Sequence, residues 1–290
     1  MLRNFFINAI RNMRKHSGYL ILNITGLTIG LTSFFLITIY VLHELSYDRF
    51  HKNYENIYRI KVKGVMAGSP LDQAITAPPM AQTLQADYPE ILHAVRLNRS
   101  GAWLVKYGET RFNEDGVLFA DSSFFSVFDF KLLSGDQKTA LSNPRSMIMT
   151  EKFAKKYFGN EDPICKRISL EADTNLYTIT GVVQNIPANS HFKFDMLGSL
   201  NSLGNSRSME WLSHNYYTYI VLKEGIKKTS MEAKLPEVVL KYVGPQLKKY
   251  IGITIEDFRR SGNQFGYSLS HCVLLESPRE LSEPSISNLK

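Results

Sequence analysis

The chain has 290 residues, of which 44% are hydrophobic and 12% aromatic, and it carries a formal net charge of +7. This hydrophobic content excludes an intrinsically disordered protein, and the length is enough for one large or two small folded domains. The positive charge does not indicate a nucleic-acid-binding protein, because four of the basic residues lie within the first fifteen positions and the others form no basic stripe.

Residues 1–17 are predicted to form a basic amphipathic segment on the cytoplasmic face of a membrane. Apolar residues recur there at helical spacing: Leu2, Phe5, Phe6, Ala9, Ile10 and Met13. Basic residues occupy the other side: Arg3, Arg11, Arg14 and Lys15. Such a helix either contacts a cytoplasmic partner or sets the topology by meeting anionic lipid, and the sequence leaves both interpretations open.

Residues 18–42 contain no Lys, Arg, Asp, Glu or His, which predicts one transmembrane helix. About 20 apolar residues cross a hydrocarbon core of about 30 Å, and this run is longer. Basic residues precede the run, whereas Glu44 and Asp48 follow it, so the positive-inside rule places the N-terminus in the cytoplasm. We therefore expect a membrane-anchored protein whose main domain, from His43 onward, lies outside the cytoplasm.

A cleaved signal peptide is the alternative to a retained anchor. Its apolar region would span about 7 to 15 residues and end at a pair of small residues. The run here is longer and continues into HELSYDRF, residues 43–50, which contains no such pair. These features favour a retained anchor.

Within the transmembrane run, Gly26 and Gly30 form a G-x-x-x-G motif. Further small residues extend it: Thr25, Thr28, Thr32 and Ser33. Such a strip lets a second helix approach closely, so Gly26 and Gly30 are candidate helix-packing residues. The alternative is that glycine is simply frequent in membrane helices. The partner helix would come from another chain, either a different membrane protein or a second copy of this one, because no other apolar run of about 18 residues follows.

After the anchor, strands and helices alternate irregularly, which predicts an α+β domain, possibly two-lobed. In its first half we expect a strand at 56–66, a turn at 68–70, a helix begun near 78–79 and stopped before Pro89, and a meander of short strands over 91–120. A short helix at 122–128, capped by Asp121 or Ser122, and a strand with a turn at 130–136 follow.

The second half continues this pattern. Thr150 is expected to cap a helix that Gly159 closes. Strands are expected at 167–170, 176–186, 191–197 and 215–225, a loop with a helical turn at 199–214, and a helix at 230–243 that Pro236 interrupts or begins. The aromatic residues at 124–130 and 216–219 are interpreted as core.

No enzyme motif is present in the sequence. The phosphate-binding G-x-x-x-x-G-K-[ST] and the nucleophile motif G-x-S-x-G are absent, so we expect no ATP hydrolysis by this chain and no catalytic residue or cofactor. The seven histidines lack metal-ligand spacing, so no metal site is predicted. A membrane-anchored enzyme is the least favoured class, although catalytic residues far apart in sequence would escape this search.

Two further sets of polar residues were considered as sites. Glu114 with Asp115, and Glu161 with Asp162, lie beside turn residues and are interpreted as solvated surface pairs. Cys165 and Cys272 are interpreted as free thiols, because a domain of this length needs no disulfide.

Four stretches together resemble bacterial ABC transporter permeases of the MacB/FtsX type. They are SYDRFHKNYENIYRI (46–60), FADSSFFSVFDFKLLSGD (119–136), MTEKFAKKYFGNEDPICKRI (149–168) and TGVVQNIPANSHFKFDML (180–197). Their order and spacing resemble the first transmembrane helix followed by the MacB-like periplasmic core domain, here 43–269. In that family a periplasmic domain lies between the first two of four membrane helices. The resemblance implies a partner ATP-binding cassette subunit, coupling of its ATP hydrolysis to export or extraction of a substrate, and often a periplasmic adaptor.

The chain departs from the family pattern at two places. Cys165 stands where the family usually has glycine, which would strain the turn if that position needs a positive φ. Residues 270–290 form a divergent polar tail without a further span, which resembles a truncated gene product. The alternative function is therefore a membrane-tethered periplasmic interaction or regulatory module without transport activity.

Overall fold

The computed structural model describes residues 11, 15, 17–99, 101–170 and 173–271. The chain divides into two units, the first ending at Tyr47 and the second beginning at Asp48. Most of the predicted amphipathic segment and nearly all of the predicted polar tail, with Cys272, lie outside the described residues.

The first unit contains helix α2 (Ser17–Glu44), which has 28 residues and no buried side chain. At 1.5 Å per residue its length is about 42 Å, which exceeds the hydrocarbon core of a bilayer. Among the described residues it is the one helix long and apolar enough to span a membrane. The hydroxyls of Thr25 and Thr28 donate hydrogen bonds to the carbonyl oxygens of Ile21 and Ile24, so these polar groups are satisfied within the helix.

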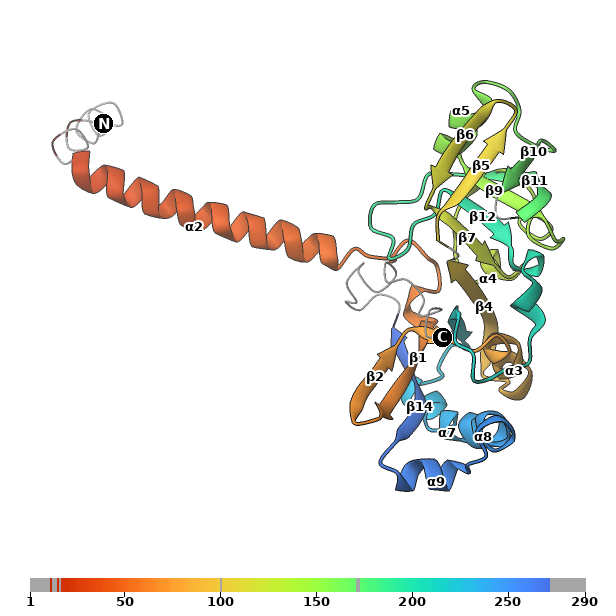
Figure 1. The fold of residues 1–290 in the computed structure, drawn as a ribbon. Helices are drawn as coiled ribbons and strands as arrows, with labels where there is room; N and C mark the ends of the chain where they lie inside the picture. The colour runs from red at the N-terminus through yellow and green to blue at the C-terminus, as the bar shows by residue number, and fades with distance from the viewer. Residues whose placement is uncertain (1–10, 12–14, 16, 100, 171–172, 272–290) are drawn as a thin grey trace. The chain divides into compact units, whose positions relative to one another are not determined.

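The second unit is built on a sheet of 14 strands (Figure 1). In chain order they are β1 (Ile57–Met66), β2 (Ser69–Gln73), β3 (Ile75–Thr76), β4 (Ile91–Arg99), β5 (Trp103–Tyr107), β6 (Thr110–Glu114), β7 (Val117–Ala120), β8 (Leu132–Gly135), β9 (Ser146–Thr150), β10 (Arg167–Leu170), β11 (Asp173–Val183), β12 (Met196–Ser199), β13 (Tyr216–Leu222) and β14 (Gln264–His271).

Short helices connect these strands. They are η1 (Tyr54–Asn56), α3 (Met80–Asp87), α4 (Phe124–Val127), α5 (Glu151–Phe158), η2 (Leu200–Ser202), η3 (Gly204–Arg207), α6 (Lys228–Glu232), α7 (Leu235–Val238), the π-helical η4 (Val239–Val243), α8 (Gly244–Ile251) and α9 (Ile255–Arg260). The expected α+β class is confirmed. Pro236 lies in the first turn of α7, so it begins a helix.

The strands follow the order β14-β1-β13-β4-β7-β12-β9-β11-β10-β5-β6. The predicted meander over 91–120 is wrong, because β4 pairs with β7 while the β5–β6 hairpin joins the far end of the sheet beside β10. The predicted strand at 191–197 is shorter than expected, since only β12 from Met196 onward joins the ladder. Both errors arise because strand order depends on long-range pairing, which local alternation does not encode.

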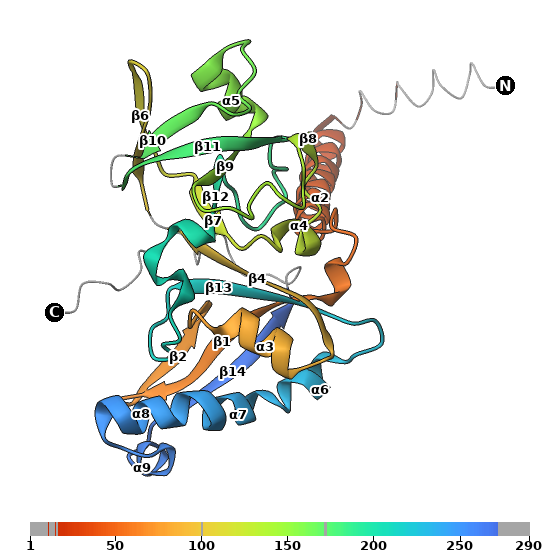
Figure 2. The ribbon, with the colours of Figure 1, turned by 90° about the vertical axis from the view of Figure 1, so that its right-hand side faces the viewer.

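The core of the second unit consists of three hydrophobic clusters. One lies between helices α3 and α6–α8 and the strands β1, β4, β13 and β14, which Figure 2 shows together. A second gathers the phenylalanines of 124–130 and 192–194 with Tyr217 and Tyr219. The third packs α5 against β9–β12. Every residue of β13 is buried, because this strand has a cluster on each face.

The helix caps follow the sequence with one exception. The Thr150 side chain accepts a hydrogen bond from the Phe153 backbone N–H at the start of α5, and Gly159 ends the helix with a φ of 62°. Both predictions are confirmed. At α4, however, the residue before the helix is Ser123 and no side chain caps it; its hydroxyl donates to the carbonyl of Ala94 instead.

Two turns require left-handed backbone. The β1–β2 hairpin turns at Ala67 and Gly68, which have φ values of 51° and 78°, so the predicted turn at 68–70 lies too late and Pro70 belongs to β2. The second turn runs from Pro163 to Lys166 and is closed by a 3.1 Å hydrogen bond, with Cys165 at its third position and a φ of 64°. This is a turn position that favours glycine, so the expected strain at Cys165 is present.

We predict that Cys165→Gly stabilises the protein by about 0.5–1 kcal/mol. The change removes a left-handed residue that costs roughly 1–2 kcal/mol, while the extra freedom of glycine in the unfolded chain offsets part of the gain. Urea unfolding of the detergent-solubilised chain, followed by tryptophan fluorescence, measures the difference. The matched control is Cys165→Ala, which keeps the strain and should be neutral; an equal gain in both variants would contradict the backbone explanation.

Candidate functional site

The second unit begins with an aspartate that is fully buried and hydrogen-bonded. Asp48 has a φ of 55°, and its backbone N–H donates to the carbonyl of Asn189 over 2.9 Å. Its carboxylate accepts a 3.1 Å bond from the backbone N–H of His191 and lies 2.7 Å from Nδ1 of the same residue. The other ring nitrogen of His191 lies 2.9 Å from the Tyr219 hydroxyl. The first residue of the second unit is thereby fixed, through His191, to Tyr219 on the interior strand β13.

His51 extends this network into the aromatic core. Its Nδ1 accepts a 2.9 Å bond from the backbone N–H of Asp129, and the Asp129 carboxylate accepts a 2.7 Å bond from the backbone N–H of Lys52. The imidazole packs against Phe50, Phe128 and Phe130 at centroid distances of 4.1–5.2 Å. We call Asp48, His51, Asp129, His191 and Tyr219 the junction cluster.

Three of the four family-like stretches converge on the junction cluster. Asp48 and His51 come from the stretch 46–60, Asp129 from 119–136, and His191 from 180–197. The fourth stretch, 149–168, instead builds α5 and the turn at Cys165. In the sequence these stretches stood out only by their resemblance to a family. Nothing in their local pattern indicated that their side chains contact one another.

The buried His51 of the junction cluster predicts that the second unit becomes less stable as the pH falls. Burial lowers the pKa of His51 from 6.5 to about 4, although Asp48 and Asp129 partly oppose the shift. Between pH 6.5 and 4 the unfolded chain therefore binds more protons than the folded chain, so stability is complete above pH 6.5 and falls as the pH drops toward 4. A shift of this size corresponds to about 3 kcal/mol.

The loss of stability on acidification is measured by urea unfolding at pH 7 and at pH 4.5. The variant His51→Gln should lose about half of the pH dependence, because burial lowers the pKa of His214 to about 4 as well. His93→Gln, a change outside the two buried sites, is the control and should behave as the parent chain. Equal pH dependence in His51→Gln and the parent chain would refute the assignment.

A second buried polar network surrounds Arg96 on β4. Its guanidinium donates two bonds to the Asp121 carboxylate, over 2.9 and 2.8 Å, and two to the carbonyls of Pro78 and Ser206, over 2.5 and 2.7 Å. The Tyr216 ring lies 5.4 Å from the guanidinium carbon. One side chain thus joins the segment before α3, the strand β4 and the helix η3. No local sequence pattern indicated this network, because partners such as Arg96 and Ser206 are 110 residues apart.

The interpretation of Glu114 as a solvated surface residue is wrong. Glu114 is buried at the end of β6, where it accepts hydrogen bonds from Lys156 Nζ over 2.7 Å and from the Tyr157 hydroxyl over 2.6 Å. Burial and this carboxylate raise the pKa of Tyr157 well above its ordinary value. The α5 residues that contact Glu114 are far from it in sequence, so the turn context was misleading. Glu161, by contrast, is an exposed partner of Lys166.

The other candidate positions are placed as follows. Gly26 and Gly30 lie on α2, and no atom lies within 4 Å of where a Cβ would stand on either residue. Cys165 is a free, exposed thiol. Among the described residues no group of His, Cys, Asp and Glu could hold a metal ion.

The family is decided by a match over most of the chain. Residues 20–238 match the family model described as MacB-like periplasmic core domain. The chain belongs to this family. Its match includes the end of α2, the junction cluster and the Arg96 network. No curated protein sequence matches the chain.

One solved structure shares the fold, and two others are similar to it over part of the chain. A domain of a putative permease protein from Porphyromonas gingivalis is 23% identical, with a TM-score of 0.65 over 76% of this chain and 91% of that chain. The periplasmic region of MacB from Actinobacillus actinomycetemcomitans is 17% identical, with a TM-score of 0.47 over 75% and 89%. The extracellular domain of the noncanonic ABC-type transporter YknZ from Gram-positive bacteria is 14% identical, with a TM-score of 0.43 over 73% and 99%.

The MacB-like assignment fixes the class of the chain. The chain joins a helix of membrane-spanning length to a periplasmic-type domain of ABC-type transporter permeases. Two of the solved structures that it resembles are described as domains of a putative permease and of an ABC-type transporter.

Proposed function

We propose that this chain is an inner-membrane permease subunit of a MacB/FtsX-type ABC transporter, with its N-terminus in the cytoplasm and its main domain in the periplasm. It couples ATP hydrolysis by a separate ATP-binding cassette subunit to movement of the periplasmic domain, for export or extraction of a substrate. Catalysis resides on the partner, and this chain transmits the conformational change.

The junction cluster is the observation that carries this proposal. A helix that transmits movement to a domain needs a connection that does not yield when the helix shifts. Asp48 stands four residues after the end of α2 and is held by three hydrogen-bonding contacts to Asn189 and His191. Because Asp48 and His51 are buried, a displacement of the chain at Asp48 has to move the interior strand β13 with it.

Co-purification tests the proposal. The full chain, extracted from its native membrane with a mild detergent, is expected to recover an ATP-binding cassette subunit identified by mass. Deletion of residues 1–15 should abolish recovery of this subunit, and the deleted chain should still resist carbonate extraction, which shows that it remains membrane-inserted. Recovery of periplasmic proteins alone, with no ATPase subunit, would favour a tethered interaction module.

Gly26 and Gly30 are proposed as the contact for another permease helix or a second copy of the chain. Replacing both with leucine is expected to reduce co-purification of the membrane partner about tenfold, because the added side chains prevent close approach of the helices. Unfolding of the periplasmic domain should not change. Ile24→Phe, which adds bulk on the opposite side of α2, is the control; equal losses in both variants would contradict a specific glycine contact.

A further inference from the structure

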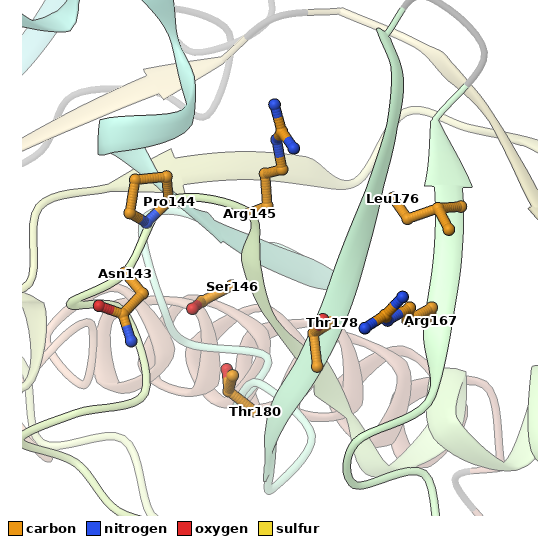
Figure 3. A pocket seen from close by; sticks show the side chains of 8 residues that line it. All are labelled: Asn143, Pro144, Arg145, Ser146, Arg167, Leu176, Thr178 and Thr180. Atoms are coloured by element: carbon orange, nitrogen blue, oxygen red, sulfur yellow. The ribbon is translucent and has the colours of Figure 1, made fainter.

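An open cleft with a volume of about 630 Å³ lies on strands β9, β10 and β11 (Figure 3). It is on the face of the sheet opposite helix α5, because Tyr177 and Ile179 of β11 pack with α5 in the core, whereas the alternating residues Thr178 and Thr180 line the cleft. The complete lining is Asn143, Pro144, Arg145, Ser146, Arg167, Leu176, Thr178 and Thr180.

The strand register sets three polar side chains in one row. Arg167 of β10 is opposite Thr178 of β11, and Thr178 is opposite Ser146 of β9. Directly opposite residues share a face of the sheet, with neighbouring strands about 4.8 Å apart. Arg145 precedes Ser146, and Figure 3 shows the guanidinium of Arg167 directed toward Thr178, whereas the extended side chain of Arg145 is directed away from this pair. Both arginines, Ser146 and Thr178 belong to the lining of the same cleft.

No acidic residue of the lining balances the positive charge of this cleft. Its lining contains two arginines and no Asp or Glu. Within the part of the chain that the structure describes, neither Arg145 nor Arg167 forms an ion pair or a side-chain hydrogen bond. Arg96, by comparison, has all of its bonds inside the protein. Cations on a concave surface concentrate positive potential in the space that they border.

Arg145 also has a strained backbone. Its φ is 61°, in the left-handed region, which costs roughly 1–2 kcal/mol for a residue with a Cβ. The conformation is fixed by its N–H, which donates to the Ser202 hydroxyl over 2.8 Å, and by its carbonyl, which accepts from the Thr178 N–H over 2.8 Å. Glycine or asparagine would be better tolerated there.

We propose that this cleft binds a multivalent oxyanion, a compound bearing several carboxylate or phosphate oxygens. Arg145 and Arg167 supply planar donor pairs that fit such oxygens, and the Ser146 and Thr178 hydroxyls donate to the same group. The proposal rests on the described residues of the cleft and does not depend on the transport function.

Isothermal titration of the full chain in a non-ionic detergent tests it, with inorganic pyrophosphate and citrate as probes. The double variant Arg145→Asn/Arg167→Gln is expected to bind at least tenfold more weakly, and added salt should weaken binding to the parent chain. Asparagine keeps the left-handed backbone, so the fold is preserved. The control Arg259→Gln/Arg260→Gln removes the same charge from exposed α9 and should bind as the parent chain does.

Each outcome decides the proposal. Binding of pyrophosphate, of citrate or of both that is lost only in the cleft variant supports it, and the probe that binds distinguishes a phosphate from a carboxylate ligand. No binding of either probe to the parent chain overturns it. Equal weakening in the cleft variant and the α9 control also overturns it, because the effect would then come from net charge alone. Thermal unfolding of each variant verifies that it is folded.

Discussion

Replacing Arg96 with methionine is expected to lower the free energy of unfolding by about 3–5 kcal/mol. The methionine fills much of the same space but leaves the Asp121 carboxylate and two buried carbonyls without their donors. Removing one partner of a buried ion pair costs this much because the remaining charge is uncompensated. A loss of this size is a large fraction of the stability of a typical domain.

Urea unfolding, followed by the fluorescence of the buried Trp211, measures the effect. The double variant Arg96→Met/Asp121→Leu should recover part of the loss, because it removes the orphaned carboxylate as well. Lys63→Met, at an exposed ion pair with Asp72, is the control and should cost less than 1 kcal/mol. A change below 1 kcal/mol in Arg96→Met would show that the guanidinium is dispensable for the fold.

Local elements of the fold were readable from the sequence. Helix α2 could be predicted from an uncharged run, and α5 from the Thr150 cap, the apolar residues along one helix face and Gly159, because each signal lies within one element. The strain at Cys165 was anticipated from the family resemblance, because the family usually has glycine at this turn position, where φ is positive.

Long-range partnerships were not readable. Asp48 and His191 are 143 residues apart, and Arg96 contacts a carbonyl 110 residues away, so no window of sequence contains both partners. Glu114 was misjudged for the same reason, because its burial depends on α5. Of the two arginines of the cleft, Arg145 lies in the turn before β9 and Arg167 lies on β10, and the pairing of β9, β10 and β11 makes both part of one lining.

Replacing Asp48 with alanine is expected to destabilise the second unit by about 3 kcal/mol and to release the chain that follows α2. The change leaves the backbone N–H and the imidazole of His191 without their acceptor, and it puts an alanine at a φ of 55°. Asp48→Asn should cost less, about 1–2 kcal/mol, because asparagine tolerates this backbone and keeps an acceptor for the N–H.

Hydrogen exchange distinguishes local release from global loss. In Asp48→Ala, the amides of residues 48–52 should lose protection first, while β9 and β11 remain protected. A double-mutant cycle with His191→Ala should give a coupling energy of at least about 1 kcal/mol, since the two side chains share one bond. Arg260→Ala, at the exposed ion pair with Asp257 on α9, is the control and should leave exchange at 48–52 unchanged. If Asp48→Ala left these amides protected, the junction cluster would not hold the chain, and the observation that carries the transmission proposal would fail with it.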